Sequence, residues 1–208
     1  MTVPIDRPLD TRPGSSRSDH PAVRSRIRAA VVLAALLLAA GRASGAAPPA
    51  EVWQRIGDLE IRGPGADYVS VGGGVFDAVG ESQGRGVRNR SAAARVEYRR
   101  GREKLAFIGP MLGLMANTDG GVYGYGGIHA EAAWGRFVLT PFGAAGGYRR
   151  GNGKDLGSVF LFRAGVGFNY ELANGTLIGV EFVHMSNAYT QDINPGEEEL
   201  LVTLALAF

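Results

Sequence analysis

The sequence predicts an all-β protein, an eight-stranded antiparallel up-and-down transmembrane β-barrel. Three observations favour this fold. After residue 46, apolar residues alternate with polar or small ones in segments separated by Gly, Asn and Asp. No run of 18 apolar residues occurs after residue 46, so no transmembrane helix is expected. Opposite charges and many of the 32 glycines share one alternating face, as a narrow polar lumen requires.

The first 46 residues have the layout of a secretory signal peptide. Three arginines between residues 24 and 28 precede an unbroken apolar run over 29–40, and small residues at 44–46 supply a cleavage site. A membrane anchor is the alternative, but a run of about twelve apolar residues is too short to cross a bilayer as a helix. Residues 1–20 are polar and rich in proline, which suggests a non-native extension upstream of the true start.

The charge of the chain argues against nucleic acid as a partner. The formal net charge is +2, but seven of the 22 basic residues and only three of the 20 acidic residues lie in the first 46. The remainder is therefore slightly acidic and lacks the basic footprint that nucleic-acid binding needs. The absence of cysteine excludes a disulfide scaffold and a thiolate zinc site, and the sequence gives no reason to expect a metal or another cofactor.

Eight strands are expected within a single domain over residues 67–208. Turn-forming residues separate several of them, for example at 117–120, 151–155 and 173–175. A short lead-in is expected over residues 47–66. The expected strands cover residues 67–79, 91–100, 103–116, 120–134, 136–149, 157–172, 176–188 and 198–208.

Two faces can be distinguished along these strands. In the sixth segment the even positions from 160 to 170 are mostly large and apolar, whereas the odd positions include Arg163, Asn169 and Glu171. The second segment places Arg95, Glu97 and other charges on one face. A soluble barrel or sandwich would turn the large apolar face inward, and a transmembrane barrel would turn it toward lipid. The pairable charges favour the membrane version.

The chain ends on an alternating strand whose last residue is Phe208. This ending resembles the C-terminal assembly signal of bacterial outer-membrane barrels. The barrel-assembly machinery is therefore an expected partner of this strand, together with the lipids of the outer membrane.

A candidate catalytic group lies near the end of the seventh expected strand. Side chains alternate along a strand, so His184 and Ser186 point to the same side. Their Cα atoms would be about 6.5 Å apart, a gap that a hydroxyl and an imidazole can close. This is the minimum for a serine activated by a general base. His129, the other histidine after residue 46, has no such neighbours and is interpreted as a wall residue.

An acid is needed to orient the imidazole, and the run Glu197-Glu198-Glu199 follows the next loop. Only Glu198 has the parity that places it on the outer face with His184 and Ser186. All three would then lie on the lipid-facing wall at the level of the outer leaflet, a costly position for polar groups without a function. The alternative is a chance His-x-Ser sequence whose polar groups meet interfacial water.

The segments His184-Met185-Ser186-Asn187-Ala188 and Asn194-Pro195-Gly196-Glu197-Glu198 resemble the signature of the lipid A 3-O-deacylase family, the PagL-type hydrolases. The likeness extends over most of the chain after the leader. It includes residues 74–77, 94–99, 110–113 and 155–157.

The resemblance implies an outer-membrane esterase that hydrolyses the 3-O-linked acyl chain of lipid A, the lipid of lipopolysaccharide. Ser186 would be the nucleophile, His184 the general base and Glu198 the orienting acid. Asn187 and Asn194 would donate to the oxyanion or shape the loop. The neighbouring even positions are expected to form the acyl groove, which consists of Val180, Phe182 and Leu200.

Three other functions remain open from the sequence. An outer-membrane phospholipase or acyltransferase could use the same outward-facing serine on a different head group. A non-enzymatic structural or adhesin-type barrel would need no serine chemistry. A soluble ligand-binding barrel would not require a membrane.

Overall fold

The computed structural model describes residues 47–79 and 90–208. The expected signal peptide over residues 1–46 lies outside the described residues. Within the described part, no helix is both long and apolar enough to span a membrane.

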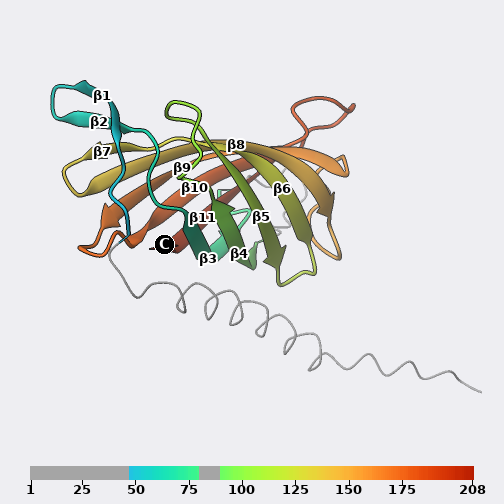
Figure 1. Ribbon diagram of the computed structural model, residues 1–208. Helices are drawn as coiled ribbons and strands as arrows, with labels where there is room; N and C mark the ends of the chain where they lie inside the picture. Colours follow the sequence, from blue (N-terminus) through green and yellow to red (C-terminus); the bar gives the residue numbers. More distant parts are fainter. Residues whose placement is uncertain (1–46, 80–89) are drawn as a thin grey trace, which may run out of the picture.

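Eight strands close into an antiparallel barrel, which confirms the predicted fold class (Figure 1). Each strand pairs with the next along the barrel, and β11 closes the barrel on β3 with Leu200 opposite Val75. The barrel strands are β3 (Tyr68–Phe76), β4 (Ser91–Arg99), β5 (Gly109–Asn117), β6 (Val122–His129), β8 (Phe137–Arg149), β9 (Phe160–Glu171), β10 (Leu177–Ser186) and β11 (Glu197–Ala207).

Three short strands extend this barrel, and the sequence did not predict them as separate elements. β1 (Val52–Ile56) and β2 (Leu59–Arg62) form a hairpin within the expected lead-in. β7 (Ala132–Trp134) continues the line of β6 after a break, so the expected strand 120–134 is interrupted. β5 begins at Gly109, later than expected, and therefore leaves β7 without a barrel neighbour on that side. β2 pairs with β7 in the position that β5 vacates.

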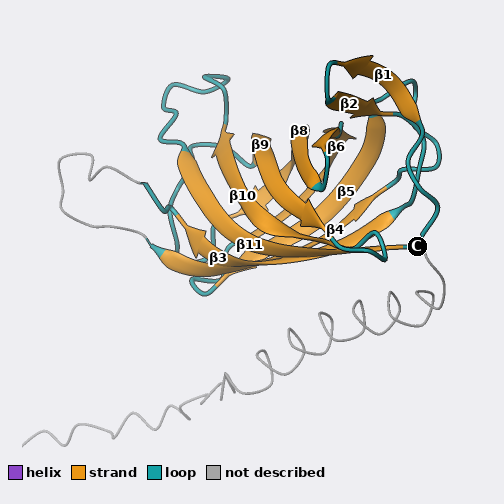
Figure 2. Cartoon of the chain, turned by 90° about the vertical axis from the view of Figure 1, so that its left-hand side faces the viewer, coloured by secondary structure: helices purple, strands orange, loops and turns teal. Residues whose placement is uncertain are grey.

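The barrel has two distinct ends. We call the end that carries Phe208 and the β1–β2 hairpin the terminal end, and the opposite end, with the connections 118–121, 150–159 and 187–196, the loop end (Figure 2). At the terminal end, the backbone of Phe208 exchanges two hydrogen bonds with Asp67. His129 lies near this end as a buried wall residue, with Nε2 3.3 Å from the carbonyl oxygen of Arg100.

The Asp67 carboxylate organises the chain at the terminal end. One oxygen accepts the backbone N–H groups of Gly101 and Arg102, at 2.8 and 3.0 Å, and the other accepts the hydroxyl of Tyr98 at 2.9 Å. Burial by itself raises the pKa of Asp67, but these hydrogen bonds outweigh it and hold the pKa below its ordinary value. The carboxylate therefore ties the start of β3 to the connection between β4 and β5.

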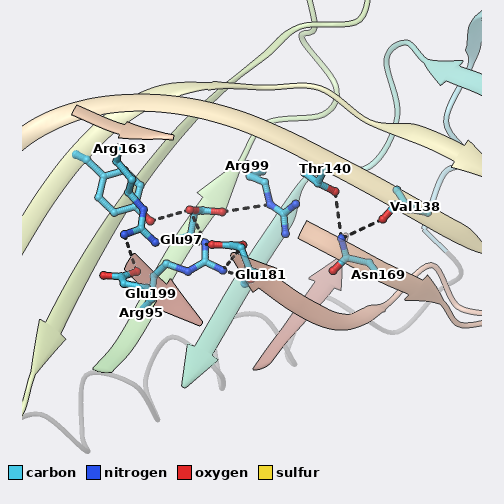
Figure 3. A network of polar contacts seen from close by, with 11 residues as sticks. Arg95, Glu97, Arg99, Val138, Thr140, Arg163, Asn169, Glu181 and Glu199 are labelled. Carbon is cyan, nitrogen blue, oxygen red and sulfur yellow. Dashed lines mark hydrogen bonds and ion pairs between the residues drawn. The ribbon is translucent and has the colours of Figure 1, made fainter. Parts of the chain in front are cut away.

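The interior of the barrel is a network of buried charges (Figure 3). Arg95 pairs with Glu97 and, at 3.0 Å, with Glu181. Arg163 pairs with Glu199 at 2.7 Å, and both side chains are fully buried. Such charges are tolerated in a dry interior only when they are paired and hydrogen-bonded. Glycine makes room for them and for the aromatic side chains, as at Gly113, where a Cβ would lie 2.4 Å from the Tyr125 hydroxyl.

The outer wall of the barrel is apolar and exposed. Phe160, Phe168, Leu200 and Val202 are each at least half exposed on this face. A soluble barrel would bury these side chains and would not fill its centre with arginine and glutamate. The distribution is that of a transmembrane barrel, so the soluble alternative is wrong.

Candidate active site on the outer wall at the loop end

A histidine and a glutamate meet on the outer face where β10 ends and β11 begins. His184 and Glu198 are direct cross-strand partners. Nδ1 of His184 lies 3.2 Å from Oε1 of Glu198, within hydrogen-bond distance. The His184 side chain is half exposed and that of Glu198 about one quarter exposed. A carboxylate in this position can fix the ring orientation and stabilise the imidazolium.

The two neighbouring glutamates turn into the barrel. Glu197 accepts the backbone N–H of Asp77 at 3.1 Å, and Glu199 pairs with Arg163. Both are fully buried. Only Glu198 is therefore available to His184, because alternation along β11 sends its neighbours to the other side.

Ser186 is the last residue of β10 and lies opposite Phe162 of β9. Alternation along the strand places it on the same outer face as His184, where its side chain is buried. Because Nδ1 of His184 faces Glu198, Nε2 is the ring nitrogen left for the serine hydroxyl. Within residues 47–79 and 90–208, no hydrogen bond joins the Ser186 hydroxyl to the ring. Catalytic contacts of this kind often tighten only when substrate is bound.

Asn187 holds the loop that follows Ser186. Its Nδ2 donates to the carbonyl oxygens of Leu156, at 3.1 Å, and Ile193, at 2.6 Å, while its Oδ1 accepts the backbone N–H of Tyr189 at 3.0 Å. The side chain is completely buried. Both amide hydrogens are thus engaged, so the side chain shapes the site and is not free to donate to an oxyanion.

Asn194 supports the same loop from its other end. Its Oδ1 accepts the backbone N–H of Asn187 at 3.0 Å. Because the Oδ1 atom of Asn194 accepts this bond, the Nδ2 group of the same side chain takes no part in it. The two asparagines together connect the beginning and the end of the loop 187–196.

Gly196 lies beside the His184 ring, a position for which the sequence analysis assigned it no role. Its φ is +56°, a left-handed conformation that favours glycine. A Cβ at this position would lie 3.1 Å from Cε1 and 3.8 Å from Nε2 of His184. The turn sequence Asn194-Pro195-Gly196 was the available signal, since it marks a sharp change of direction just before β11.

A second chain of contacts links the start of β11 to the other loops. Lys154 donates to Asp77 at 2.7 Å, and the Asp77 backbone in turn donates to Glu197. The Tyr148 hydroxyl donates to the backbone carbonyl of Lys154 at 3.1 Å. These bonds fix the position of Glu197, and with it the register of Glu198.

The expected acyl-groove residues form an apolar row below the site. Phe182 and Leu200 are cross-strand partners, and Val180 follows on the same face. All three are between 45% and 50% exposed. Among the described residues, no group of three or more His, Asp or Glu side chains comes together as a metal site.

In comparisons with known proteins, the family model for lipid A 3-O-deacylase (PagL) matches residues 84–207. No curated protein gives a significant match.

Several solved structures are similar to the chain. A crystal structure of the outer membrane enzyme PagL has 18% identity, covers 68% of this chain and 99% of its own, and gives a TM-score of 0.48. A structure from the de novo design of transmembrane β-barrels has 14% identity, covers 70% and 97%, and gives 0.47. The Yersinia pestis outer membrane protein Ail has 12% identity, covers 69% and 99%, and gives 0.38.

Proposed function

This chain belongs to the lipid A 3-O-deacylase (PagL) family, and from that premise we propose that it is an outer-membrane esterase with a Ser186–His184–Glu198 mechanism. The reaction would release the ester-linked acyl chain at position 3 of lipid A as a fatty acid. The contact between His184 and Glu198 on the lipid-facing wall, beside Ser186, is the observation that carries the proposal.

In the proposed first step, Nε2 of His184 takes the hydroxyl proton of Ser186 as its oxygen attacks the ester carbonyl carbon. Glu198 holds the proton on Nδ1 and stabilises the imidazolium that forms. The Asn194 amide is the side-chain donor left for the oxyanion, and one such donor typically contributes about 3–4 kcal/mol. Collapse of the intermediate breaks the ester bond, and His184 protonates the departing sugar hydroxyl.

In the second step, water attacks the acyl-serine. His184 takes a proton from the water and returns it to Ser186 as the fatty acid leaves. The enzyme is then in its original protonation state. Within the protein, no group other than Ser186 and His184 has to exchange a proton.

The proposed orientation places the loop end at the cell surface and the terminal end in the periplasm. Outer-membrane barrels have short periplasmic turns and longer outer loops. β10 would then run outward and bring Ser186 to the outer leaflet, where lipid A resides. The apolar row formed by Phe182, Leu200 and Val180 would accept the acyl chain beside the nucleophile.

Export and assembly are further parts of the proposal. Residues 1–46 would direct the chain across the inner membrane as a signal peptide, and the barrel-assembly machinery would recognise the strand that ends in Phe208. The mature protein would begin near residue 47.

Lipid A mass spectrometry in a host without this activity tests the function. The native protein should remove one ester-linked acyl chain, and Ser186→Ala should leave lipid A unmodified. Ser158→Ala is the matched control, because its hydroxyl only accepts the Phe160 backbone N–H in a neighbouring loop. Full activity of Ser186→Ala would contradict the mechanism. Loss of acyl chains from phospholipids in place of lipid A would point to the phospholipase alternative.

A further inference from the structure

We propose that a groove at the terminal end of the barrel binds an acyl chain of a phospholipid whose phosphate lies beside Arg136. The groove measures about 330 Å³ and is formed where the β1–β2 hairpin stands against the outer wall. It is lined by Asp58, Leu59, Ala132, Trp134, Phe137, Leu139 and Phe168.

The barrel side of this groove belongs to the lipid-facing wall. Phe137, Leu139 and Phe168 point outward and are between 42% and 50% exposed. Phe137 stacks on Phe168 with ring centroids 5.6 Å apart. The groove is thus continuous with a surface that meets hydrocarbon in a transmembrane barrel. The bilayer around this wall supplies acyl chains, so an acyl chain is the expected occupant of the groove.

The hairpin turns this part of the flat wall into a groove. Leu59 of β2 lies opposite Trp134 of β7, and Trp134 is the cross-strand partner of Phe137. A chain lying against Phe137 would therefore have apolar neighbours on the hairpin as well as on the barrel. This extra contact distinguishes a binding site from the general lipid boundary, because buried apolar area sets the strength of such binding.

A positive charge lies just outside the groove, whose own lining contains one charged residue, Asp58. Arg136 is exposed in the turn between β7 and β8, and its guanidinium lies 5.9 Å from the centre of the Tyr170 ring. Tyr170 in turn meets Phe137 edge to face at 5.6 Å. Arg136 makes no ion pair with another residue in the part of the chain that the structure describes. A cation next to an apolar groove suits an amphipathic ligand with an anionic head group.

The assignment to a phospholipid of the inner leaflet rests on the proposed orientation of the barrel. The groove and Ser186 lie at opposite ends of the barrel, so a lipid in the groove would not be in position for hydrolysis. The hairpin also precedes residues 84–207, the part that the family model matches. The groove would therefore be a second lipid site, separate from the catalytic one.

The two tryptophans of the chain provide the test. Trp53→Phe leaves Trp134 as the sole tryptophan and reporter. The full barrel is reconstituted in phosphatidylcholine vesicles that contain a phosphatidylcholine brominated in mid-chain, and fluorescence quenching is measured. Trp134 should be strongly quenched by the brominated chain and poorly quenched by aqueous acrylamide. The reverse pattern would overturn the proposal.

Retention of phospholipid after detergent extraction separates a site from boundary lipid. Native mass spectrometry should show Leu59→Ser weakening retention roughly tenfold through lost apolar contact. Arg136→Gln should weaken it roughly fivefold, the effect of one basic residue near an anionic lipid surface. Leu114→Ser is the control, since Leu114 is 60% exposed on β5 and does not line the groove.

Equal retention by all three variants would overturn the proposal. Heat-modifiable migration checks that each variant is folded, and Arg136→Gln, which removes no apolar contact, keeps the test valid if Leu59→Ser does not fold. Both groove variants should deacylate lipid A at the native rate. If the native protein retained lipid but did not deacylate lipid A, the proposed function would be wrong and the proposed lipid site would still be supported.

Discussion

Gly196→Ala should slow deacylation by displacing the imidazole of His184. The new methyl group would lie 3.1 Å from Cε1 of the ring, whereas carbon atoms in good contact are about 3.5–4.0 Å apart. The ring must therefore move by about half an ångström. Because a misplacement of about 1 Å can cost a hundredfold in rate, we expect kcat to fall about tenfold.

The same substitution also has a backbone cost, and this has to be separated from the effect on His184. An alanine at a positive φ destabilises the chain by roughly 1–2 kcal/mol. Gly135→Ala is the matched control, because Gly135 has a φ of +58° and no atom within 4 Å of its Cβ position. It should lose stability to a similar extent and keep its native kcat.

Steady-state deacylation of purified lipid A in detergent micelles gives kcat and KM for both variants, and urea unfolding gives their stabilities. We expect a lower kcat with little change in KM for Gly196→Ala, because the methyl group contacts His184 and not the apolar row. If Gly196→Ala and Gly135→Ala deacylate at the same rate, the glycine has no role in positioning the ring.

Three further variants test other contacts. Glu198→Gln should lower kcat roughly a hundredfold or more in the deacylation assay, because it removes the anion that orients His184; an unchanged kcat would argue against that role. Arg163→Met should destabilise the barrel by about 3–5 kcal/mol in urea unfolding, and the double variant with Glu199→Met should recover much of this loss; no recovery would show that the pair is not coupled. Asp67→Asn should cost about 2 kcal/mol at neutral pH. Because the pKa of Asp67 is held below its ordinary value of 3.8, the ionised form stabilises the fold above that pH, and the native advantage should vanish as pH falls through the lower folded pKa. A difference that persists in strong acid would refute this assignment.

The barrel itself could be predicted because its two faces differ so clearly in chemistry. Phe168 alternates with Asn169, and Leu200 and Val202 alternate with Glu199 and Thr203, a pattern that divides each strand into two faces. An alternation with a period of two allows only two arrangements of the barrel, one with the apolar face toward lipid and the inverted one with the apolar face inside. The charges at Arg95 and Arg163 decide between the two, because an unpaired arginine in hydrocarbon would be far too costly.

The β1–β2 hairpin was missed because its strands are short. Residues 52–56 and 59–62 are too few to establish a clear alternation, although Gly57-Asp58 between them is a typical two-residue hairpin turn. Its partner, β7, became available only because β5 begins late, at Gly109. The starting point of a neighbouring strand is a tertiary feature that local pattern does not specify.

Part of the candidate site could also be predicted from the sequence, because it lies within one hairpin. Register within one hairpin places His184 opposite Glu198, and parity along the strand is enough to choose that glutamate. The contact of Asn187 with Leu156 joins two loops that are distant in sequence. Closeness of this kind depends on how the loops fold over the barrel end, so sequence spacing could not show that the Asn187 amide is engaged by carbonyl oxygens of these loops.

Because the barrel wall is a single layer of strands, adjacent residues of β11 face two different environments. Glu198 and Glu199 are chemically identical neighbours, yet one belongs to the bilayer side and the other to a sealed ionic interior. Inserting or deleting a single residue within the strand would exchange these assignments along its length, whereas the same change in the preceding loop could be absorbed. Natural variation in chain length should therefore be concentrated in the loops, with the strand kept at constant length even where its individual side chains differ.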